Sequence, residues 1–304
     1  MSLSEAEARR VALEAQGDEE RQRRGLVSRY LRRSPGAIVG AALVGLFVGV
    51  ALFAPVLAPH DVSRGDLSQV RPGVVPGPSA AHPLGLDQQG RDELSRLVYG
   101  ARASLVIGVS SVALGALVGG LIGAVAGAFG GWIETVAMRL MDVMLAIPGL
   151  LFAVGLAALL GPSLLSVMIA IGVGGVPVVA RLLRGAIVIE REKLYVNAAK
   201  VVGARRWRIV TRHVLPNTLA PVLVAATLAI GGAILTAAGL SFLGLGPNDP
   251  SIPEWGKMLA ESEGLLETSP QLVFFPGAAI VLSVLGFNLL SDGLRDALDP
   301  KHRR

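Results

Sequence analysis

Long stretches without a single charged side chain constrain this sequence more than any other feature. From Gly36 to Leu57 no charged residue occurs. At helical rise this run spans roughly 33 Å, which is enough to cross the hydrocarbon core of a bilayer. Comparable charge-free runs cover Ala103–Trp132, Val143–Ala180, Val214–Asn248 and Gln271–Ser291.

The run from 143 to 180 is about two membrane thicknesses long. It is interrupted at Gly161-Pro162-Ser163, a turn signal, so we read it as two spans. Charged residues make up only 17% of the chain and hydrophobic residues 52%, which leaves too little polar surface for a soluble domain. Spans in lipid must satisfy their own backbone hydrogen bonds. The sequence therefore predicts an all-α, polytopic membrane protein with six transmembrane helices.

Several classes of function lack their sequence signature. The net charge of +5 comes with only 5% aromatic residues and no basic domain, so nucleic-acid binding is not expected. There is no cysteine, no Gly-x-x-x-x-Gly-Lys-Ser/Thr phosphate loop, no His-Glu-x-x-His and no Gly-x-Ser-x-Gly. The four histidines are scattered without ligand spacing. We therefore expect no catalytic, cofactor-binding or metal-ligating residues, and no enzyme.

Lysine and arginine are distributed unevenly between the two sides of the predicted membrane. The N-terminal tail, the segment 181–212 and the C-terminal end, together with Arg139, hold 22 of them. The alternate segments 59–102, 161–164 and 244–272 hold six. Cytoplasmic segments carry the excess of positive charge. We therefore predict a multi-pass protein of the cell (inner or plasma) membrane with both termini in the cytoplasm.

These observations divide the chain into five parts. The second outer segment, 244–272, is counted within the five-helix core. The first long outer segment is expected to carry an interfacial helix, because Leu94, Leu97 and Val98 share one helical face there. The parts are a cytoplasmic tail (1–35), the first transmembrane helix (36–58), an extracytoplasmic loop with that helix (59–101), a five-helix core including a loop at 190–217 (102–295) and a cytoplasmic C-terminus (296–304).

The second span carries glycine at every fourth position, at Gly115, Gly119, Gly123 and Gly127, and again at Gly131. Small residues at this spacing let helix backbones approach closely. We predict a helix-packing face, and we favour packing within the chain over contact with a partner subunit.

The predicted spans contain few residues that kink a helix or carry charge. Pro148 and Pro177 are expected to kink the third and fourth spans, because proline lacks a backbone donor. Asp142 is the most deeply embedded ionisable residue, and Arg139, three residues earlier, is its expected partner. Such a small number of embedded charges argues against a carrier driven by a carboxylate proton relay.

A basic segment, NAAKVVGARRWRIVTRHVLP at 197–216, separates two apolar runs. We predict one helix from about Val188 to Val202, ended by Gly203, and a second from Arg205 that stops before Pro216. Helical spacing then puts Trp207, Val210 and Val214 on one face, and Arg205, Arg208 and Arg212 opposite. Such an amphipathic helix suits either anionic lipid headgroups or a groove on a soluble partner, and the residues alone leave both open.

The same segment resembles the EAA loop of ABC importer permeases: Ala198, Ala199, Gly203, Leu215 and Pro216 match its spacing. Asn197 departs from the family's glutamate, which weakens any ion pair at that position to a hydrogen bond. The stretches HPLGLDQQGRD, YGARASL, MRLMDVMLAIP, SFLGLG and FNLLSDGLRDALDP resemble, in order, the dipeptide/oligopeptide/nickel branch of these permeases. The resemblance covers about 36–300.

The resemblance implies the type I ABC importer permease fold and a subunit that forms half of a translocation pathway for di- and oligopeptides. It implies a homologous second permease, two ATP-binding cassette ATPases and an extracytoplasmic substrate-binding protein as partners, beside membrane lipid. ATP and magnesium would be bound by the ATPases, with no cofactor in this chain. The expected ATPase-coupling residues are Asn197, Ala198, Ala199, Gly203, Arg205, Trp207, Leu215 and Pro216.

Alternatives to this function stay open at this point. One is a channel or secondary carrier that works without ATP, and another is a membrane scaffold or sensor that moves no substrate. Within the family, nickel or glutathione in place of peptides is the other alternative.

Overall fold

The structure is a computed structural model that describes residues 34–70 and 75–298, and all regular elements in these two ranges are helices. Five of them are long and apolar enough to cross a membrane. These are α2 (Pro35–Leu52), α4 (Glu93–Phe129), α7 (Leu164–Arg191), α10 (Leu215–Phe242) and α12 (Gln271–Leu298). The expected tails at 1–35 and 296–304 lie almost wholly outside the described residues.

A bent pair of helices supplies the sixth apolar passage when it is counted as one span. The helices α5 (Gly131–Leu145) and α6 (Gly149–Leu160) meet at an angle of 88°. Pro148 lies at the break, as the N-terminal cap of α6, and it cannot donate the backbone hydrogen bond that would continue α5. The bend expected at Pro148 is confirmed, but the span is not a single helix from 143 onward. Pro177 lies inside α7.

The first span is shorter than the sequence predicts. Its helix α2 ends at Leu52, and a separate single turn, α3 (Ala54–Leu57), follows. Pro55 stands in the first turn of α3, where a missing backbone donor is tolerated. The charge-free run therefore extends beyond the helix that it predicts.

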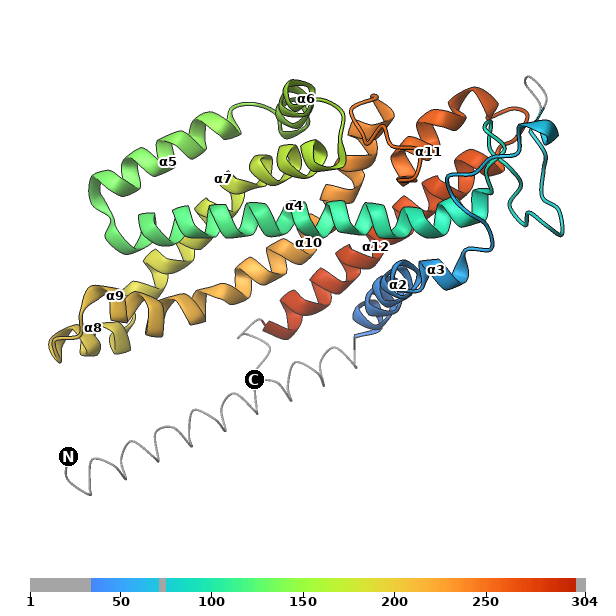
Figure 1. The fold of residues 1–304 in the computed structure, drawn as a ribbon. Helices are drawn as coiled ribbons and strands as arrows, with labels where there is room; N and C mark the ends of the chain where they lie inside the picture. The colour runs from blue at the N-terminus through green and yellow to red at the C-terminus, as the bar shows by residue number, and fades with distance from the viewer. Residues whose placement is uncertain (1–33, 71–74, 299–304) are drawn as a thin grey trace.

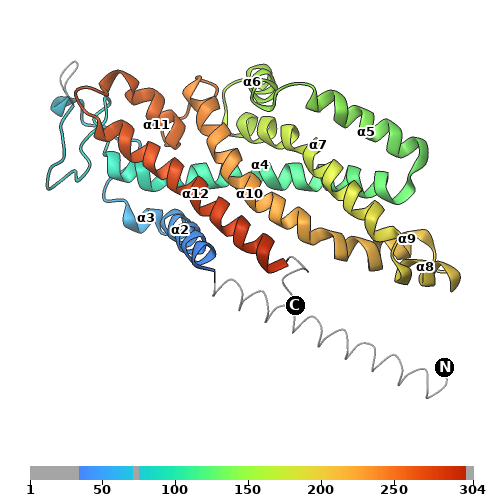
Figure 2. The same ribbon diagram turned by 180° about the vertical axis from the view of Figure 1, so that it is seen from behind.

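Helix α4 lies in the middle of the bundle, and its C-terminal half packs against α7 (Figure 1). On its other side α10 and α12 cross it, and α12 also packs against α2 (Figures 1 and 2). The short helices α8 (Leu194–Val201) and α9 (Arg206–Ile209) lie at one end of the bundle, and α11 (Trp255–Ser262) lies at the opposite end.

The end of the bundle that carries α11 is a folded structure, which we call the cap (residues 58–70, 75–92 and 243–270). It contains two single turns besides α11, η1 (Leu67–Gln69) and η3 (Glu263–Leu265). The interfacial helix expected within 59–101 is not separate, because residues from Glu93 onward are the start of α4. Glu93 and Arg96 are buried, so this turn of α4 packs within the protein and does not lie along the membrane surface.

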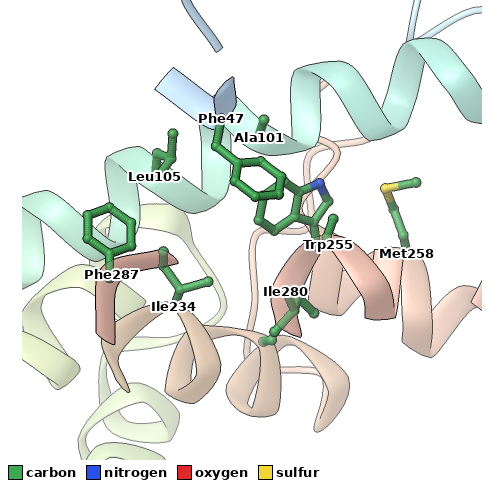
Figure 3. Close-up of a cluster of buried hydrophobic side chains, with 10 residues drawn as sticks. Phe47, Ala101, Leu105, Ile234, Trp255, Met258, Ile280 and Phe287 are labelled. Carbon is green, nitrogen blue, oxygen red and sulfur yellow. The ribbon is translucent and has the colours of Figure 1, made fainter. Parts of the chain in front are cut away.

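Trp255 joins the cap to the membrane-spanning helices. It is fully buried at the start of α11 and lies among side chains from α2, α4, α10 and α12 (Figure 3). Its ring meets Phe47 edge to face at 5.5 Å, and its Nε1 donates to the backbone oxygen of Leu97. A Cβ on Gly100 would lie 2.6 Å from the indole, so only glycine leaves room for this ring. The sequence alone did not distinguish this anchor from a plain loop.

Candidate functional site

The basic segment (197–216) lies at the end of the bundle opposite the cap, in the connection that follows α7 after Arg191 (Figure 1). The helix expected from Val188 to Val202 is interrupted at Glu192-Lys193, so that α8 starts anew at Leu194. After α8 the chain turns at Gly203, whose φ is +82°. Nothing lies within 4 Å of a Cβ built there, so the backbone conformation alone requires glycine.

The second helix does not stop before Pro216 as predicted. Helix α9 runs through a five-residue π-helical turn, η2 (Val210–Val214), directly into α10. The backbone N–H of Leu215 donates to the carbonyl of Val210, five residues back, and this wider turn lets Pro216 enter the first turn of α10. The segment is therefore continuous with a membrane-spanning helix.

Three apolar side chains bind the segment to the ends of the spans. Val196 from α8 and Val214 from η2 are fully buried, and Ile209 from α9 is nearly so. They form one cluster with Leu183 and Ile187 of α7. The inner face of the segment is thus packed against the ends of α7 and α10.

A polar network holds the same junction. The Tyr195 hydroxyl donates to the buried carboxylate of Glu190 at 2.6 Å. The Asn217 amide donates to the carbonyl of His213 at 2.7 Å and lies 3.4 Å from the Tyr195 hydroxyl. Burial, together with the hydrogen bond to Glu190, raises the pKa of Tyr195 to about 12, so the hydroxyl stays protonated as the donor.

The outward face of the segment is apolar and basic. Leu194, Val201 and Val202 are each 87% exposed. Trp207 is 67% exposed, so it does not share the buried face of Val210 and Val214 that helical spacing predicts. The basic residues Arg205, Arg208 and Arg212 are exposed as well. Large apolar side chains displayed next to cations mark a surface that contacts either a protein partner or the membrane.

The remaining predicted coupling residues lie on the same segment. Asn197 and Ala198 are exposed on α8, whereas Ala199 is half-buried against the apolar cluster. Leu215 packs on that cluster, and Pro216 is exposed. Asn197 makes at least one interaction within the chain.

The glycines of α4 face α7 at backbone contact. A Cβ on Gly119 would lie 2.4 Å from the carbonyl oxygen of Val176, and one on Gly123 equally close to that of Ala180. Gly115 and Gly127 also lie against α7. Gly131, which continues the spacing, has open space around it because α4 ends at Phe129.

Asp142 has a different principal partner from the one expected. It forms an ion pair with Arg181 of α7, whereas Arg139 lies 3.9 Å away. A second pair, Arg184 with Glu134, joins the same two helices. Both pairs line a cavity of about 720 Å³. The sequence does show that Arg181 and Arg184 share one helical face. It does not show that α5 folds back along α7 and brings Asp142 and Glu134 to them.

A second cavity, of about 190 Å³, lies between α4, α7 and α10. Its lining is mostly small and apolar, with Gly115, Gly175 and Ala229 among the residues. Ser111 also lines it, and its hydroxyl has no hydrogen-bond partner within the described chain.

The cap and the first turn of α4 share a buried ionic network that sequence reasoning missed. Arg96 donates to Glu261 of α11 at 2.6 Å and lies 3.3 Å from Asp87. Arg91 also pairs with both carboxylates. A neighbouring group brings together His60, His82 and Asp92. The sequence alone did not reveal this group, because folding of the cap brings together residues that are far apart in sequence. The expectation of no metal-ligating residues stays a prediction.

Two family models match the chain. Residues 119–304 match the model described as binding-protein-dependent transport system inner membrane component. Residues 24–72 match the N-terminal TM domain of oligopeptide transport permease C.

Curated relatives are similar over most of their length. The chain is 45% identical over 273 residues to the dipeptide transport system permease protein of Alkalihalophilus pseudofirmus, covering 90% of this chain and 88% of the relative. It is 47% identical over 268 residues to the di/tripeptide transport system permease protein of Pseudomonas aeruginosa, covering 88% of each. It is 41% identical over 274 residues to the glutathione transport system permease protein of Pectobacterium atrosepticum, covering 90% and 89%.

A solved structure shares the fold. A chain of the MetNI methionine ABC transporter in an inward-facing conformation aligns with a TM-score of 0.56 at 18% sequence identity. The alignment covers 67% of this chain and 97% of that chain.

Proposed function

The chain belongs to the family of binding-protein-dependent transport system inner membrane components, and from this premise we propose that it is a permease subunit of an ATP-driven importer of di- and oligopeptides. It would form half of the translocation pathway. It would carry no ATPase activity of its own, since it lacks a phosphate loop.

The observation that carries the coupling role is the two-sided character of the segment 190–217. Its inner face is packed into the ends of α7 and α10 by Val196 and Val214. Its outer face presents Val202 and Trp207 without covering side chains. We propose that this outer face inserts into a groove of an ATPase subunit. Closure of the ATPases on ATP would then move α7 and α10 together, and hydrolysis would reset them.

The proposed assembly has four further subunits and a defined orientation. A homologous permease would complete the pathway, two ATPases would bind the cytoplasmic ends and hold ATP and magnesium, and a substrate-binding protein would deliver from outside. The excess of lysine and arginine supports a cytoplasmic location for both termini and for the segment 190–217. The cap would then face outward, toward the binding protein.

The cavity between α4, α7 and α10 supports a pathway of low selectivity. Small apolar residues such as Gly175 and Ala229 offer little side-chain recognition, while Ser111 and Thr236 offer the hydrogen-bonding side chains of the lining. Such a lining suits peptides of varied side chains. Glutathione is the alternative cargo, because a relative with that transport name is 41% identical to this chain.

The test compares variants of the outer face in the reconstituted transporter. Trp207→Ala removes a large exposed anchor, and buried aromatic anchors of interfaces are commonly worth about 2 kcal/mol or more, a factor of about 30 in affinity. We expect ATPase retention in a pull-down and binding-protein-stimulated hydrolysis both to fall steeply.

Gly203 gives a second arm with a matched control. Gly203→Val should tilt the outer face, because β-branched residues are disfavoured at positive φ, whereas Gly203→Asn should be tolerated far better. Neutral replacements of Arg205 and Arg208 separate the rival model of lipid attachment, in which these charges would matter most. Wild-type behaviour of both Trp207→Ala and Gly203→Val would show that the segment does not couple to an ATPase.

A further inference from the structure

Three metal-ligating side chains meet at the outer end of α4. Asp92 is the N-terminal cap of α4, His82 stands in a turn ten residues earlier, and His60 follows α3. The Nδ1 atom of His82 lies 2.9 Å from Oδ1 of Asp92, and Nδ1 of His60 lies 3.7 Å from the same oxygen. The two imidazole rings lie 4.6 Å apart. One ligand atom from each residue falls within a set no more than 4.8 Å across.

The carboxylate at the centre of this group is held by the surrounding structure. Oδ2 of Asp92 accepts hydrogen bonds from the backbone N–H and the hydroxyl of Ser95, at 2.8 and 2.7 Å. The Ser95 hydroxyl also accepts from the backbone N–H of His60 at 3.0 Å, which ties the His60 segment to the same helix turn. Oδ1 is therefore aimed at the two histidines. Outer hydrogen bonds of this kind orient the ligands in metal sites.

We propose that His60, His82 and Asp92 bind a divalent transition-metal ion of the zinc class. Nitrogen and oxygen ligands about 2.0–2.1 Å from a tetrahedral ion are separated from one another by about 3.3 Å. The two observed nitrogen-to-oxygen separations, 2.9 and 3.7 Å, lie on either side of that value. Two imidazoles and one carboxylate suit zinc, nickel or copper, while magnesium and calcium prefer oxygen ligands alone.

The exposure of the three ligands indicates how the ion is reached. The Asp92 side chain is 1% exposed, that of His82 18% and that of His60 41%. The site is therefore closed on the side of α4 and open at His60, where water would complete the coordination. The ion would join three segments: the connection after the first span, through His60; the turn at His82; and the start of α4, through Asp92. Its role is to stabilise the cap.

The experiment measures metal binding by the full-length chain, purified in detergent with an affinity tag that contains no histidine and stripped with a chelator. Zinc is titrated by calorimetry, and cobalt serves as an absorbance probe of tetrahedral coordination. We expect one ion per wild-type chain. His60→Ala should abolish binding, and because 41% of this side chain is exposed, its loss should leave the fold intact.

The remaining histidines provide the matched control. The proposed ligands include two of the four histidines of the chain, so the double variant His213→Ala/His302→Ala, which removes the other two, should bind zinc as the wild type does. Ser95→Ala, which removes one of the two hydrogen bonds to Oδ2 of Asp92 and leaves the one from the backbone N–H, should weaken binding by about 10- to 100-fold. Zinc should also raise the thermal unfolding midpoint of the wild type but not of His60→Ala.

Two outcomes would contradict the metal site. If the wild type and His60→Ala bind the same amount of zinc, or if neither binds it, the group is only a hydrogen-bonded clasp between His82 and Asp92. A loss of binding confined to the His213→Ala/His302→Ala variant would likewise overturn the assignment.

Discussion

Replacing Gly123 with alanine adds one methyl group at the contact between α4 and α7. The added Cβ would lie 2.4 Å from the carbonyl oxygen of Ala180, where ordinary contact begins at 3.4 Å. The helices must therefore separate locally by 1.0 Å (3.4 minus 2.4), because the atom in the way is backbone and cannot rotate aside. Overpacking of this kind costs about 1–3 kcal/mol, and the loosened contact is the most extensive in the bundle.

Gly120 is the matched control, since it lies on the same helix three residues away. A Cβ there meets only the tip of Leu183, at an ordinary 3.9 Å. Gly120→Ala should thus keep the gain of about 0.5–1 kcal/mol that alanine brings to a helix interior. Because that gain applies to both glycines, the two variants should differ by the overpacking cost, about 1–3 kcal/mol. In detergent, the thermal unfolding midpoint of Gly123→Ala should fall below wild type while that of Gly120→Ala should not. Equal midpoints for the two variants would refute the packing model.

Two further predictions test the orientation and the junction of the coupling segment. Cysteines at the exposed positions Arg64 and Glu267 should react with an impermeant thiol reagent added outside intact cells, while one at Val202 should not; the reverse pattern would invert the topology. Tyr195→Phe leaves the buried Glu190 without its short hydrogen bond and should weaken coupling at neutral pH. Because folding raises the Tyr195 pKa from 10.0 to about 12, the wild-type bond contributes fully below pH 10 and is lost as the pH rises toward 12; protease sensitivity of the segment should rise in that window in wild type but not in Tyr195→Phe.

The parts of the fold that local chemistry dictates were predictable from the sequence. Charge-free runs became helices because backbone groups in an apolar segment must bond within it. Pro148 broke a helix and Gly203 took a positive φ, each for a reason contained in the residue itself. The spacing of Gly119 and Gly123 pointed to a close-packed face, which lies against α7.

The parts that depend on tertiary packing were not predictable. Nothing local to Asp142 reveals that Arg181 approaches it from another helix. His60 and His82 look scattered until the cap folds. Pro216 does interrupt the backbone hydrogen bonds of the helix, as predicted. The helix nevertheless continues, because a π-helical turn before Pro216 accommodates the missing donor. For Asp142 and for the two histidines, the missing information was which segments lie side by side.

That π-helical turn bears directly on how the proposed coupling would work. If the helix ended before Pro216, a flexible connection would join the outer face to α10. A displacement of Trp207 would then not move α10. Because α9 runs through η2 into α10, the exposed Trp207 and the membrane-spanning helix form one continuous rod. The α8 side is different, since α7 and α8 are separated by a break at Glu192-Lys193. There the connection is made by Val196 and by the Tyr195 bond to Glu190, which are side-chain contacts. Motion of a bound ATPase would therefore reach α10 through the continuous backbone and α7 through side-chain packing. From α7 it would reach α4 at Gly119 and Gly123, where the backbones of the two helices are in direct contact.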